Sequence, residues 1–407
     1  MKILILTHTF PKYPRDSTAA FMHPLVMGLM AAGDDVTVLT PFHRELTPGA
    51  FPYPIVTYKY IWPEKFHVLG YSQTLHHGTH FRLSTWLLSP MIIFFCFIAL
   101  LRLTRNHAYD IVSVHWIVPN GIIAALVLAL RKIPFTVTLP GSDVYVAQKF
   151  TFFKIAAHWA AERASAVYSD SPQYFKELAT TGASLKRKAI IPYPVDFSQM
   201  GNSNYLRGLR KKLGLDARAR IVVSVGRLVE KKGIHYMIRA LPQVLRKIPN
   251  THYVIVGDGD WRDHLEAEID ASRVRDHVHF VGNISRDEIG KYYRLADVFV
   301  APSIRDSRGN IDDRPVAIIE AMARSRAVVA TRFPGNALTI DDQTGILVPQ
   351  KKSAALASSV VKLLKLPTLR NRLGRNARRK VYKTFRHTVI GERYHTLFCG
   401  ILARRDV

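Results

Sequence analysis

The segment IVVSVGRLVEKKGIHYMIRALPQVLRKIPNTHYVIVG, residues 221–257, decides the fold of this chain. It opens with the apolar run Ile221–Val225, continues through an amphipathic stretch that predicts a helix from about Lys232 to Ile248, and ends in the apolar run His252–Gly257. A strand, a helix and a second strand in this order form a βαβ unit with parallel strands. The segment therefore predicts an α/β domain.

The same alternation continues through the second half of the chain. Further strands are predicted at Val278–Val281, Val298–Ala301 and Val328–Thr331, with helices at about Asp287–Leu295 and Val316–Arg324. Repeated β–α units of this kind indicate a doubly wound parallel sheet, in which ligands bind beyond the carboxyl ends of the strands.

The first half of the chain shows a less regular version of this pattern. Ser17-Thr18 is predicted to cap a first helix, which ends at Gly33. The predicted strands are Ile3–Thr7, Val36–Thr40, Ile111–Val114, Phe135–Leu139, Ala166–Ser169 and Ala189–Ile191.

A polar, basic stretch at residues 198–220 separates the two patterned halves. We therefore expect two Rossmann-like domains, residues 1–200 and 201–380, that face a central cleft. A basic helical tail, residues 381–407, is expected to pack back toward the first domain. Clefts between domains are common ligand sites.

Composition limits the class of protein. The chain has 407 residues, enough for two hydrophobic cores, and only two cysteines, which fits a reducing cytoplasm. The apolar run at the N-terminus stops at Thr7, before it reaches the length of a signal peptide. A net charge of +26 attracts nucleic acid, anionic membrane or phosphorylated ligands without choosing among them, and it also favours solubility.

The segment Trp86–Leu101 is almost wholly apolar. It is shorter than the roughly 20 residues that span a bilayer, Ser89-Pro90 interrupts it, and Arg102 and Arg105 follow. A core helix or a helix on a membrane surface fits this pattern better than a span, and the sequence leaves contact with the membrane open.

The strongest candidate site lies between Asp312 and Glu320. Pro315 suits the first turn of a helix, whose N-terminal N–H groups near Val316-Ala317 can bind a phosphate. The two carboxylates can accept hydrogen bonds from sugar or ribose hydroxyls. The plainer alternative is an acidic N-terminal cap and one solvated glutamate.

A second candidate follows the strand Ile221–Val225. Gly226-Arg227 ends this strand and Lys232-Gly233 opens the next helix, so two cations at the carboxyl end of a sheet can hold a diphosphate. The alternative is a basic loop on a basic protein. The turn Val256–Asp260 contains two glycines but is no dinucleotide fingerprint.

Taken in order, these motifs resemble the large retaining glycosyltransferase family of GT-B fold, family 4 or glycosyl transferases group 1. The resemblance covers nearly the whole chain. The matching segments are His8–Pro11, His115–Pro119, Pro140–Val144, Gly226–Leu228, Val256–Gly259, Asp312–Met322 and Thr344–Pro349.

The resemblance implies a role for each matching residue. Arg227 and Lys232 would neutralise the donor diphosphate and the charge that grows on the leaving group. Glu320 would hold the donor ribose. Asp312 stands where the family usually has glutamate and would face the transferred sugar.

Other positions would complete the site. The donor would also contact Gly226, Val316, Ala317, Asn283, Ile284 and Ser17, the last from a loop of the first domain. His115 is a candidate catalytic residue, and His8 and Asp143 are candidates for binding the acceptor; a histidine that serves only the fold is an equal alternative.

Several positions depart from the family pattern. Pro140-Gly141 replaces a His-Gly pair, Arg15-Asp16-Ser17 replaces a Gly-Gly loop, and Ser325-Arg326-Ala327 replaces Gly-x-Pro. Ala337-Leu338 replaces a later Pro-Glu. These changes point to an unusual donor or to weaker catalysis, although the phosphate clamp, the pair Arg227 and Lys232, is retained.

The resemblance thus implies a glycosyltransferase that moves a sugar, with retention, from a nucleoside-diphosphate sugar to an acceptor, which we expect to be a lipid-linked or glycan acceptor of the cell envelope. The segment Trp86–Leu101, the aromatic stretch Phe51–Trp62 and the basic surface favour peripheral contact with anionic membrane at its cytoplasmic face. We expect no nucleic acid, no metal and no cofactor besides the sugar nucleotide, since His76, His77 and His80 lack a ligand pattern.

Two alternatives stay open, a sugar-nucleotide epimerase of the same fold and a non-catalytic protein that binds polyanions or membrane. The sequence does not specify the base, the sugar, the acceptor, the linkage formed or the oligomeric state.

Overall fold

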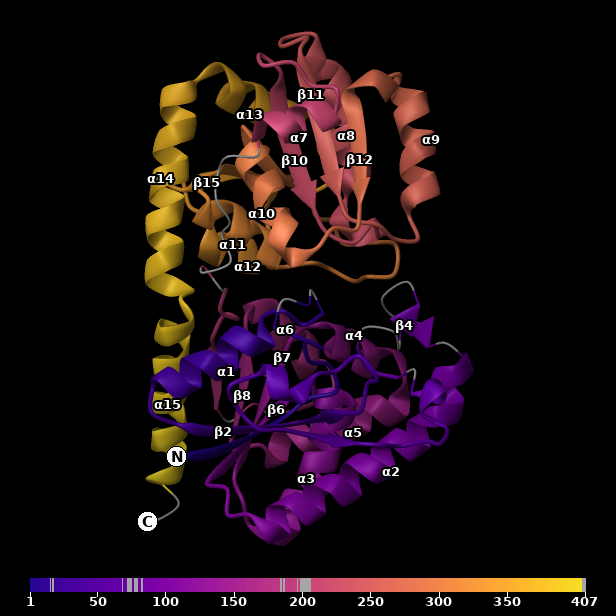
Figure 1. Cartoon of the computed structure of the whole chain (residues 1–407), viewed down its shortest axis with the longest axis vertical. Helices are drawn as coiled ribbons and strands as arrows, with labels where there is room; N and C mark the ends of the chain where they lie inside the picture. Colours follow the sequence, from indigo (N-terminus) through magenta and orange to yellow (C-terminus); the bar gives the residue numbers. More distant parts are fainter. Residues whose placement is uncertain are drawn as a thin grey trace. The chain divides into compact units, whose positions relative to one another are not determined.

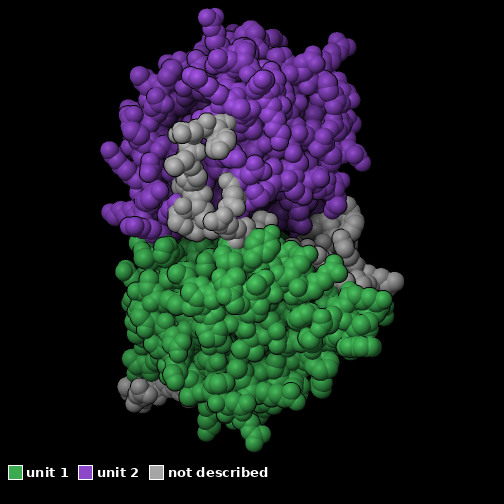
Figure 2. Space-filling view, in the orientation of Figure 1, with its two compact units in different colours: residues 1–194, 387–407 green, residues 195–386 purple. Residues whose placement is uncertain are grey.

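The computed structural model describes residues 1–14, 16, 18–67, 69–71, 75–76, 80–81, 83–183, 185, 187–195, 197 and 206–404. The chain forms two compact units, shown in different colours in Figure 2. Unit 1 comprises Met1–Pro194 and His387–Val407, and unit 2 comprises Val195–Arg386. The sequence had placed the corresponding boundaries near residues 200 and 380.

Unit 1 is built on a seven-stranded parallel sheet with strand order β3-β2-β1-β6-β7-β8-β9. This confirms the predicted fold class. The order reverses between β1 and β6, so the loops after these two strands lie at a topological switch point. The strands are β1 Lys2–Leu6, β2 Asp35–Pro41, β3 Ile55–Tyr58, β6 Ile111–His115, β7 Phe135–Leu139, β8 Ala166–Ser169 and β9 Lys188–Ile190.

Helices follow most strands of unit 1 (Figure 1). They are α1 Met22–Ala31, α2 Leu83–Asn106, α3 Ile122–Arg131, α4 Ser142–Lys149, α5 Thr151–Arg163, α6 Pro172–Ala179 and α15 His387–Leu402. A short antiparallel hairpin joins β4 Leu75–His76 to β5 His80–Phe81.

The predicted cap of the first helix is wrong. Helix α1 begins at Met22, its N-cap is Phe21, and no side chain caps it. Ala19 has a left-handed φ of 45°, which breaks any helix that begins at Thr18. The Thr18 hydroxyl instead hydrogen-bonds the Asp16 carboxylate at 3.2 Å.

The aromatic stretch Phe51–Trp62 is mostly a structural element. It contains strand β3 at the edge of the first sheet, which the sequence patterns did not reveal. Phe51 and Tyr53 are buried against Phe10, and Trp62 is exposed. Four aromatic side chains of the stretch, those of Phe51, Tyr53, Tyr58 and Tyr60, are therefore buried within unit 1.

Unit 2 is built on a six-stranded parallel sheet with strand order β12-β11-β10-β13-β14-β15. The strands are β10 Arg220–Val225, β11 Thr251–Val256, β12 Val278–Gly282, β13 Val298–Ala301, β14 Ala327–Thr331 and β15 Gly345–Val348. The helices are α7 Leu206–Lys212, α8 Ile234–Leu245, α9 Arg262–Ser272, α10 Arg286–Leu295, α11 Val316–Ala323, α12 Pro334–Thr339, α13 Ser353–Lys365 and α14 Pro367–Thr384.

Both faces of the second sheet are covered. Val222 packs into one hydrophobic core together with residues of α8 and α13, and the next residue, Val223, packs into the other together with residues of α11 and α14. Successive side chains of a strand point to opposite faces, so a sheet buried on both sides needs continuous apolar runs. Such runs are what the sequence provides at Ile221–Val225 and Val298–Ala301.

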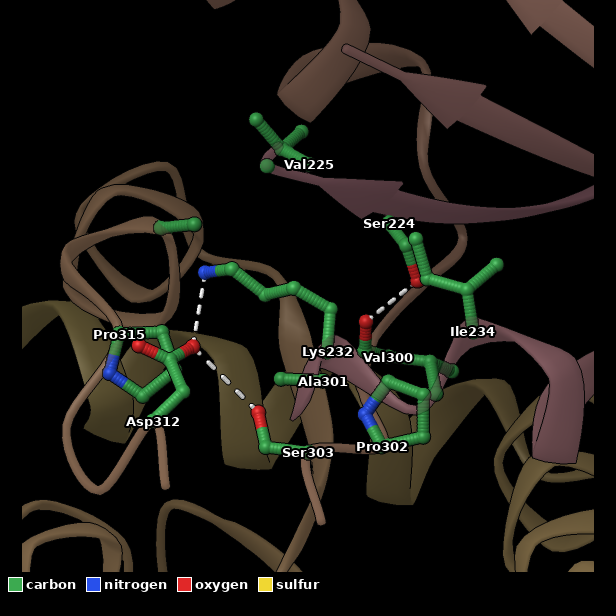
Figure 3. A pocket seen from close by; sticks show the side chains of 12 residues that line it. Ser224, Val225, Lys232, Ile234, Val300, Ala301, Pro302, Ser303, Asp312 and Pro315 are labelled. Carbon is green, nitrogen blue, oxygen red and sulfur yellow. Dashed lines mark hydrogen bonds and ion pairs between the residues drawn. The ribbon is translucent and has the colours of Figure 1, made fainter. Parts of the chain in front are cut away.

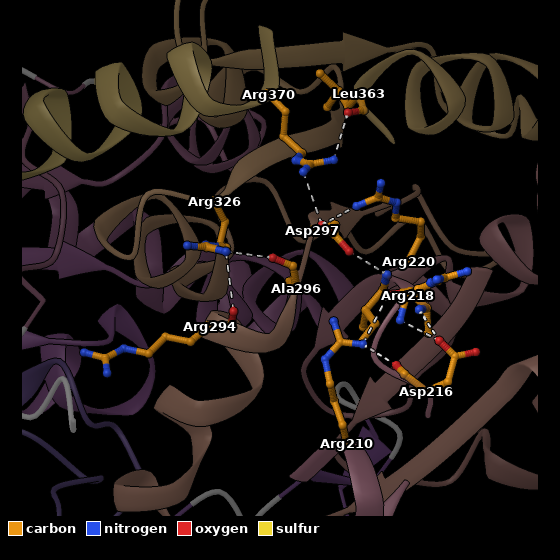
Figure 4. A network of polar contacts seen from close by, with 12 residues as sticks. Arg210, Asp216, Arg218, Arg220, Arg294, Ala296, Asp297, Arg326, Leu363 and Arg370 are labelled. Carbon is orange, nitrogen blue, oxygen red and sulfur yellow. Dashed lines mark hydrogen bonds and ion pairs between the residues drawn. The ribbon is translucent and has the colours of Figure 1, made fainter. Parts of the chain in front are cut away.

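Arginine side chains bind the residues just before β13, at the amino end of the second sheet (Figure 4). Asp297, just before β13, accepts the backbone N–H of Ile221 at 2.9 Å and pairs with Arg370 of α14 at 3.3 Å. Arg326 donates to the carbonyl of Ala296 at 2.9 Å. Part of the excess positive charge is therefore built into the fold.

Helix α15 returns to unit 1 and packs against α1 (Figure 1). A Cβ on Gly391 would lie only 2.0 Å from the carbonyl oxygen of Gly28, so glycine at both positions permits this close approach. The buried Asp34 carboxylate reinforces the contact, because it accepts from the N-terminal ammonium at 3.0 Å and from His395 at 2.9 Å.

Replacing Gly391 with alanine is expected to destabilise unit 1 by about 2 kcal/mol, because the added methyl group forces the two helices apart. Gly400→Ala is the matched control on the same helix, since a Cβ there meets nothing within 4 Å. Chemical denaturation checks the prediction; equal midpoints for both variants would contradict it.

Candidate functional site

A small pocket opens at the carboxyl end of the second sheet, where β10 and β13 end side by side (Figure 3). Carboxyl ends of parallel strands are where ligands bind in such sheets. The pocket is lined by Ser224, Val225, Gly226, Lys232, Ile234, Val300, Ala301, Pro302, Ser303, Asp312, Pro315 and Ala317.

The central polar contact of the pocket is an ion pair. The Lys232 Nζ lies 2.7 Å from Asp312 Oδ2, and each side chain keeps about 20% of its surface accessible. Burial by itself raises the pKa of Asp312, but the charges of Lys232 and Lys231 and hydrogen bonds from Lys232 and Ser303 outweigh it. The net pKa is lowered, so this carboxyl is ionised at neutral pH.

The backbone places Lys232 at this point. Lys232 ends a short 3-10 turn, and Gly233 then caps helix α8 with a left-handed φ of 64°. A Cβ on Gly233 would lie 2.0 Å from the carbonyl oxygen of Pro302, so only glycine lets this loop lie against the end of β13. The Lys-Gly pair that the sequence singled out is thus fixed by local geometry.

Helix α11 begins beside the ion pair. Pro315 is its N-cap, and Val316 and Ala317 form its first turn, with Ala317 lining the pocket. The first N–H groups of a helix have no partner within the helix and carry the positive end of its dipole. The structure therefore brings together Gly226, Lys232, Asp312 and the start of α11, an arrangement able to bind an anion.

Arg227 does not join this contact. Its side chain is exposed and, among the described residues, it makes no hydrogen bond or ion pair. Its charge does act nearby: burial lowers the pKa of Lys231, and the charges of Lys232 and Arg227 lower it further against the opposing effect of Asp312.

Glu320 is neither solvated nor part of the pocket lining, so the alternative of a solvated glutamate is wrong. Its carboxylate is buried and bound on both oxygens, by Arg286 at 2.9 Å and by the Tyr293 hydroxyl at 2.6 Å. Arg324 donates to its carbonyl oxygen at 3.2 Å. A ribose that reached Glu320 would meet a carboxylate already held in one orientation.

Three further donor residues of the prediction lie elsewhere. Asn283 is exposed in the loop after β12, and Ile284 packs against the core of unit 2. Ser17 lies outside the described residues.

A second polar cluster lies in unit 1, at the loops after β1 and β6. His115 ends β6, is fully buried, and its Nδ1 lies 3.3 Å from the Tyr193 hydroxyl. The Asn120 amide nitrogen lies 3.2 Å from His8 Nδ1 and donates to the carbonyl of His115 at 2.9 Å. Burial lowers the pKa of His8 to about 4 and that of His115 to about 3, so both rings are neutral at neutral pH.

Two features mark this cluster as more than packing. His115 Nε2 is buried without a hydrogen-bond partner among the described residues. The next residue, Trp116, has a positive φ of 68°, and its ring lies 4.7 Å from the His8 ring at an interplanar angle of 52°. Orphaned polar atoms and strained backbone collect at binding sites.

Asp143 has a structural task in this unit. Its two carboxylate oxygens accept the backbone N–H groups of Ile117 at 2.7 Å and Gly141 at 3.2 Å. Burial raises its pKa to about 6, against the lowering effect of these N–H groups. The structure thus shows Asp143 tying two loops together, while its predicted contact with an acceptor stays a prediction.

Sequence reasoning missed several residues of these sites: Lys231, Ser303, Arg286, Tyr293, Asn120 and Tyr193. No local pattern marks Arg286 or Tyr293, because their partner Glu320 lies on another helix. Asn120, five residues after His115, carried a signal, since it follows a strand end at the switch point of the first sheet. Within the described part of the chain, no group of histidine, cysteine or carboxylate side chains could hold a metal ion.

Two protein-family profiles match the chain. The profile described as "Glycosyl transferase 4-like domain" matches residues 18–194, and the profile "Glycosyl transferases group 1" matches residues 207–380. The two matches follow the two units of the structure.

Curated relatives agree with these matches. The chain is 27% identical to the putative teichuronic acid biosynthesis glycosyltransferase TuaC of Bacillus subtilis over 89% of both chains. It is 24% identical to the alpha-monoglucosyldiacylglycerol synthase of Acholeplasma laidlawii over 75% of this chain and 79% of that one. The chain is 37% identical to the alpha-D-kanosaminyltransferase of Streptomyces kanamyceticus over 42% of each chain. This match therefore spans less than half of that relative's length.

Solved structures share the fold. The HepE protein of Anabaena, in complex with UDP-glucose, superposes with a TM-score of 0.73 and 18% identity over 98% of this chain and all of that one. The sucrose-phosphate synthase of Thermosynechococcus elongatus gives 0.73 at 22% identity, over 99% and 100%. At this identity the likeness establishes the architecture alone.

The neutral His115 predicts a pH dependence of stability. Its pKa is about 3 in the folded chain, below the ordinary 6.5, so unfolded chains take up the proton first as the pH falls. The stability that the folded chain gains from a neutral His115 ring is complete above pH 6.5 and is lost as the pH falls toward 3. At pH 5 the free energy of unfolding is already lower by about 2 kcal/mol.

His115→Gln should therefore show a flatter loss of unfolding free energy between pH 6.5 and 4.5 than the wild type. Comparing the two slopes removes the contribution of Asp143, whose raised pKa acts in the opposite direction. The exposed His107, replaced in the same way, serves as control. Identical slopes for wild type and His115→Gln in denaturant titrations would refute the prediction.

Proposed function

The chain belongs to the GT-B fold glycosyltransferases with a 4-like domain followed by a group 1 domain, and from this membership we propose that it transfers a sugar from a nucleoside-diphosphate sugar to an acceptor hydroxyl. The observation that carries the proposal is the Lys232–Asp312 pair beside the start of α11, at the carboxyl end of the second sheet. A cation and a helix N-terminus directed at one pocket suit a diphosphate.

In this proposal the diphosphate replaces Asp312 as the partner of the Lys232 ammonium. Lys232 and the first N–H groups of α11 contact the phosphates, and the free guanidinium of Arg227 turns toward them. Both cations then face the charge that develops on the leaving group, where such preorganised stabilisation is often the largest catalytic contribution. The protein itself offsets this charge, so the scheme gives no role to a metal ion.

Asp312, released from Lys232, would accept hydrogen bonds from the transferred sugar, and Glu320 would accept them from the ribose. Asn283, Ile284 and Ser17 would contact the donor from loops around it. We propose that transfer retains the anomeric configuration. The departing phosphate can then take the acceptor proton, so no strong base is demanded of the chain, and the neutral His115 and His8 suffice to orient the acceptor hydroxyl.

The relatives favour an acceptor of the cell envelope. One relative is named for teichuronic acid synthesis, another for synthesis of a glucosyldiacylglycerol, and a third, from Mycolicibacterium smegmatis, for mannosylation of a phosphatidylinositol mannoside. We propose a lipid-linked or glycan acceptor and action at the cytoplasmic face of the membrane.

Calorimetric titration with UDP-, GDP- and ADP-sugars tests the donor site, and product analysis with lipid and glycan acceptors tests transfer. Arg227→Ala is expected to lower kcat/KM about a hundredfold, because it removes one cation from the leaving group. Arg246→Ala, an exposed arginine at the end of α8, is the control. Full transfer by Arg227→Ala would exclude the clamp, and an epimerised sugar nucleotide without transfer would indicate an epimerase.

Asp312→Asn separates the two roles of this carboxylate. Without its negative charge, Lys232 is free for the diphosphate, so affinity for the nucleoside diphosphate should rise about tenfold. Transfer should fall, because the sugar loses an acceptor of hydrogen bonds.

Asp312→Glu, which restores the residue usual in the family, should keep both properties close to wild type. Calorimetry with the nucleoside diphosphate alone, beside the transfer assay, checks this. Weaker diphosphate binding by Asp312→Asn would show that the carboxylate does not compete for Lys232.

A further inference from the structure

Helix α2 of unit 1 presents a long apolar face that the described protein does not cover. Its segment Leu87–Asn106 is long and apolar enough to cross a membrane, and only 22% of it is buried. Leu87 and Phe94 are 70% and 58% exposed. Such side chains cost free energy in water, so they call for an apolar surface outside this chain.

The helix is nevertheless anchored. Ile92, Cys96, Leu100 and Thr104 are buried and recur every four residues, which places them on one side of the helix. At about 3.6 residues per turn, Leu87, Phe94 and Arg105 fall on the opposite side. Because these buried residues run along one side of the helix from Ile92 to Thr104, α2 lies along the surface of its unit, and a helix held in this way lies on a membrane rather than crossing it.

Two neighbouring helices extend the apolar face. Helix α3 contacts both α2 and α5, and all three are labelled on unit 1 in Figure 1. Leu130 of α3 is 73% exposed, and Phe152 and Ile155 of α5 are 72% and 64% exposed. Large apolar side chains are therefore exposed on three helices, and α3 contacts each of the other two.

Basic residues outnumber acidic ones on these three helices. Helices α2 and α3 contain no acidic residue, and α5 contains only Glu162. Arg102 and Arg105 of α2 and Lys154 of α5 are exposed beside the apolar side chains. An apolar face edged by cations complements a bilayer with anionic head groups better than it complements a second copy of the same basic face.

We propose that the exposed face of α2, α3 and α5 is the surface by which the chain docks, without spanning, on an anionic membrane. This deepens the proposed function, because it names the face of unit 1 that meets the membrane carrying the acceptor. Leu87, Phe94, Leu130, Phe152 and Ile155 enter the interface between head groups and acyl chains, and Arg102, Arg105 and Lys154 contact the anionic head groups.

Flotation of the full-length chain with vesicles tests the proposal. The chain should bind vesicles of phosphatidylcholine mixed with phosphatidylglycerol, and its partition coefficient should fall about a hundredfold on phosphatidylcholine alone, since each of three cations contributes about fivefold. Arg102→Gln/Arg105→Gln should reduce binding to the anionic vesicles only. Failure of the wild type to float with anionic vesicles would overturn the proposal.

The apolar contribution needs matched variants. Leu87→Gln/Leu130→Gln should weaken vesicle binding at least about tenfold, and Phe152→Gln/Ile155→Gln should do the same. Leu338→Gln/Leu366→Gln replaces two exposed leucines of unit 2 and should leave flotation unchanged. Equal losses in the test and control pairs would overturn the proposal.

Two further measurements complete the test. A dimer that Leu87→Gln/Leu130→Gln converts to monomer in analytical ultracentrifugation, without vesicle binding, would assign the face to a second copy and overturn the proposal. Calorimetry with nucleotide sugars in the absence of lipid distinguishes the membrane-docking proposal from the proposed function. Donor binding by the test variants shows that these variants are folded. Absence of donor binding by the wild type would count against the proposed function alone.

Discussion

The ion pair between Lys232 and Asp312 joins two loops that follow different strands of the second sheet. Both loops lie at the carboxyl ends of the parallel strands, which is where such sheets bind ligands. Both side chains are partly desolvated, and an unpaired charge there would be costly. The pair therefore holds these two loops together. In the proposed function a diphosphate would replace Asp312 as the partner of Lys232, so stability and binding would depend on the same contact.

The strong positive charge has several separate uses. Arg370 and Arg326 close the amino end of the second sheet, and Arg286 holds the buried Glu320. Arg370 and Arg286 are paired with carboxylates, which offset their charges, whereas Arg326 donates to backbone carbonyl groups and holds the fold together. The cations left exposed beside apolar side chains, such as Arg102 and Arg105, are the ones that can act on a partner. Net charge alone would not have separated these groups.

Two departures from the family pattern have a local explanation. Ser325 stands where the family usually has glycine, and its backbone is left-handed with φ 58°, a conformation that glycine adopts readily. Gly141, retained where the preceding histidine is replaced by Pro140, has φ 111° and lies so close to the Tyr174 ring that a Cβ would clash with it. In both places the backbone adopts a conformation that glycine favours, although the neighbouring side chains differ from the family pattern.

The sequence by itself determined the two parallel sheets, most strand positions and the loops that carry Lys232, Asp312 and His115, because strand and helix periods and turn glycines are local properties of the chain. Only the tertiary structure decided the partners of Glu320, the edge strand β3 and the exposed side of α2. Each of these depends on contacts between segments far apart in sequence. Periodicity shows which residues share a face of an element; what that face meets is set by the packing of the whole chain.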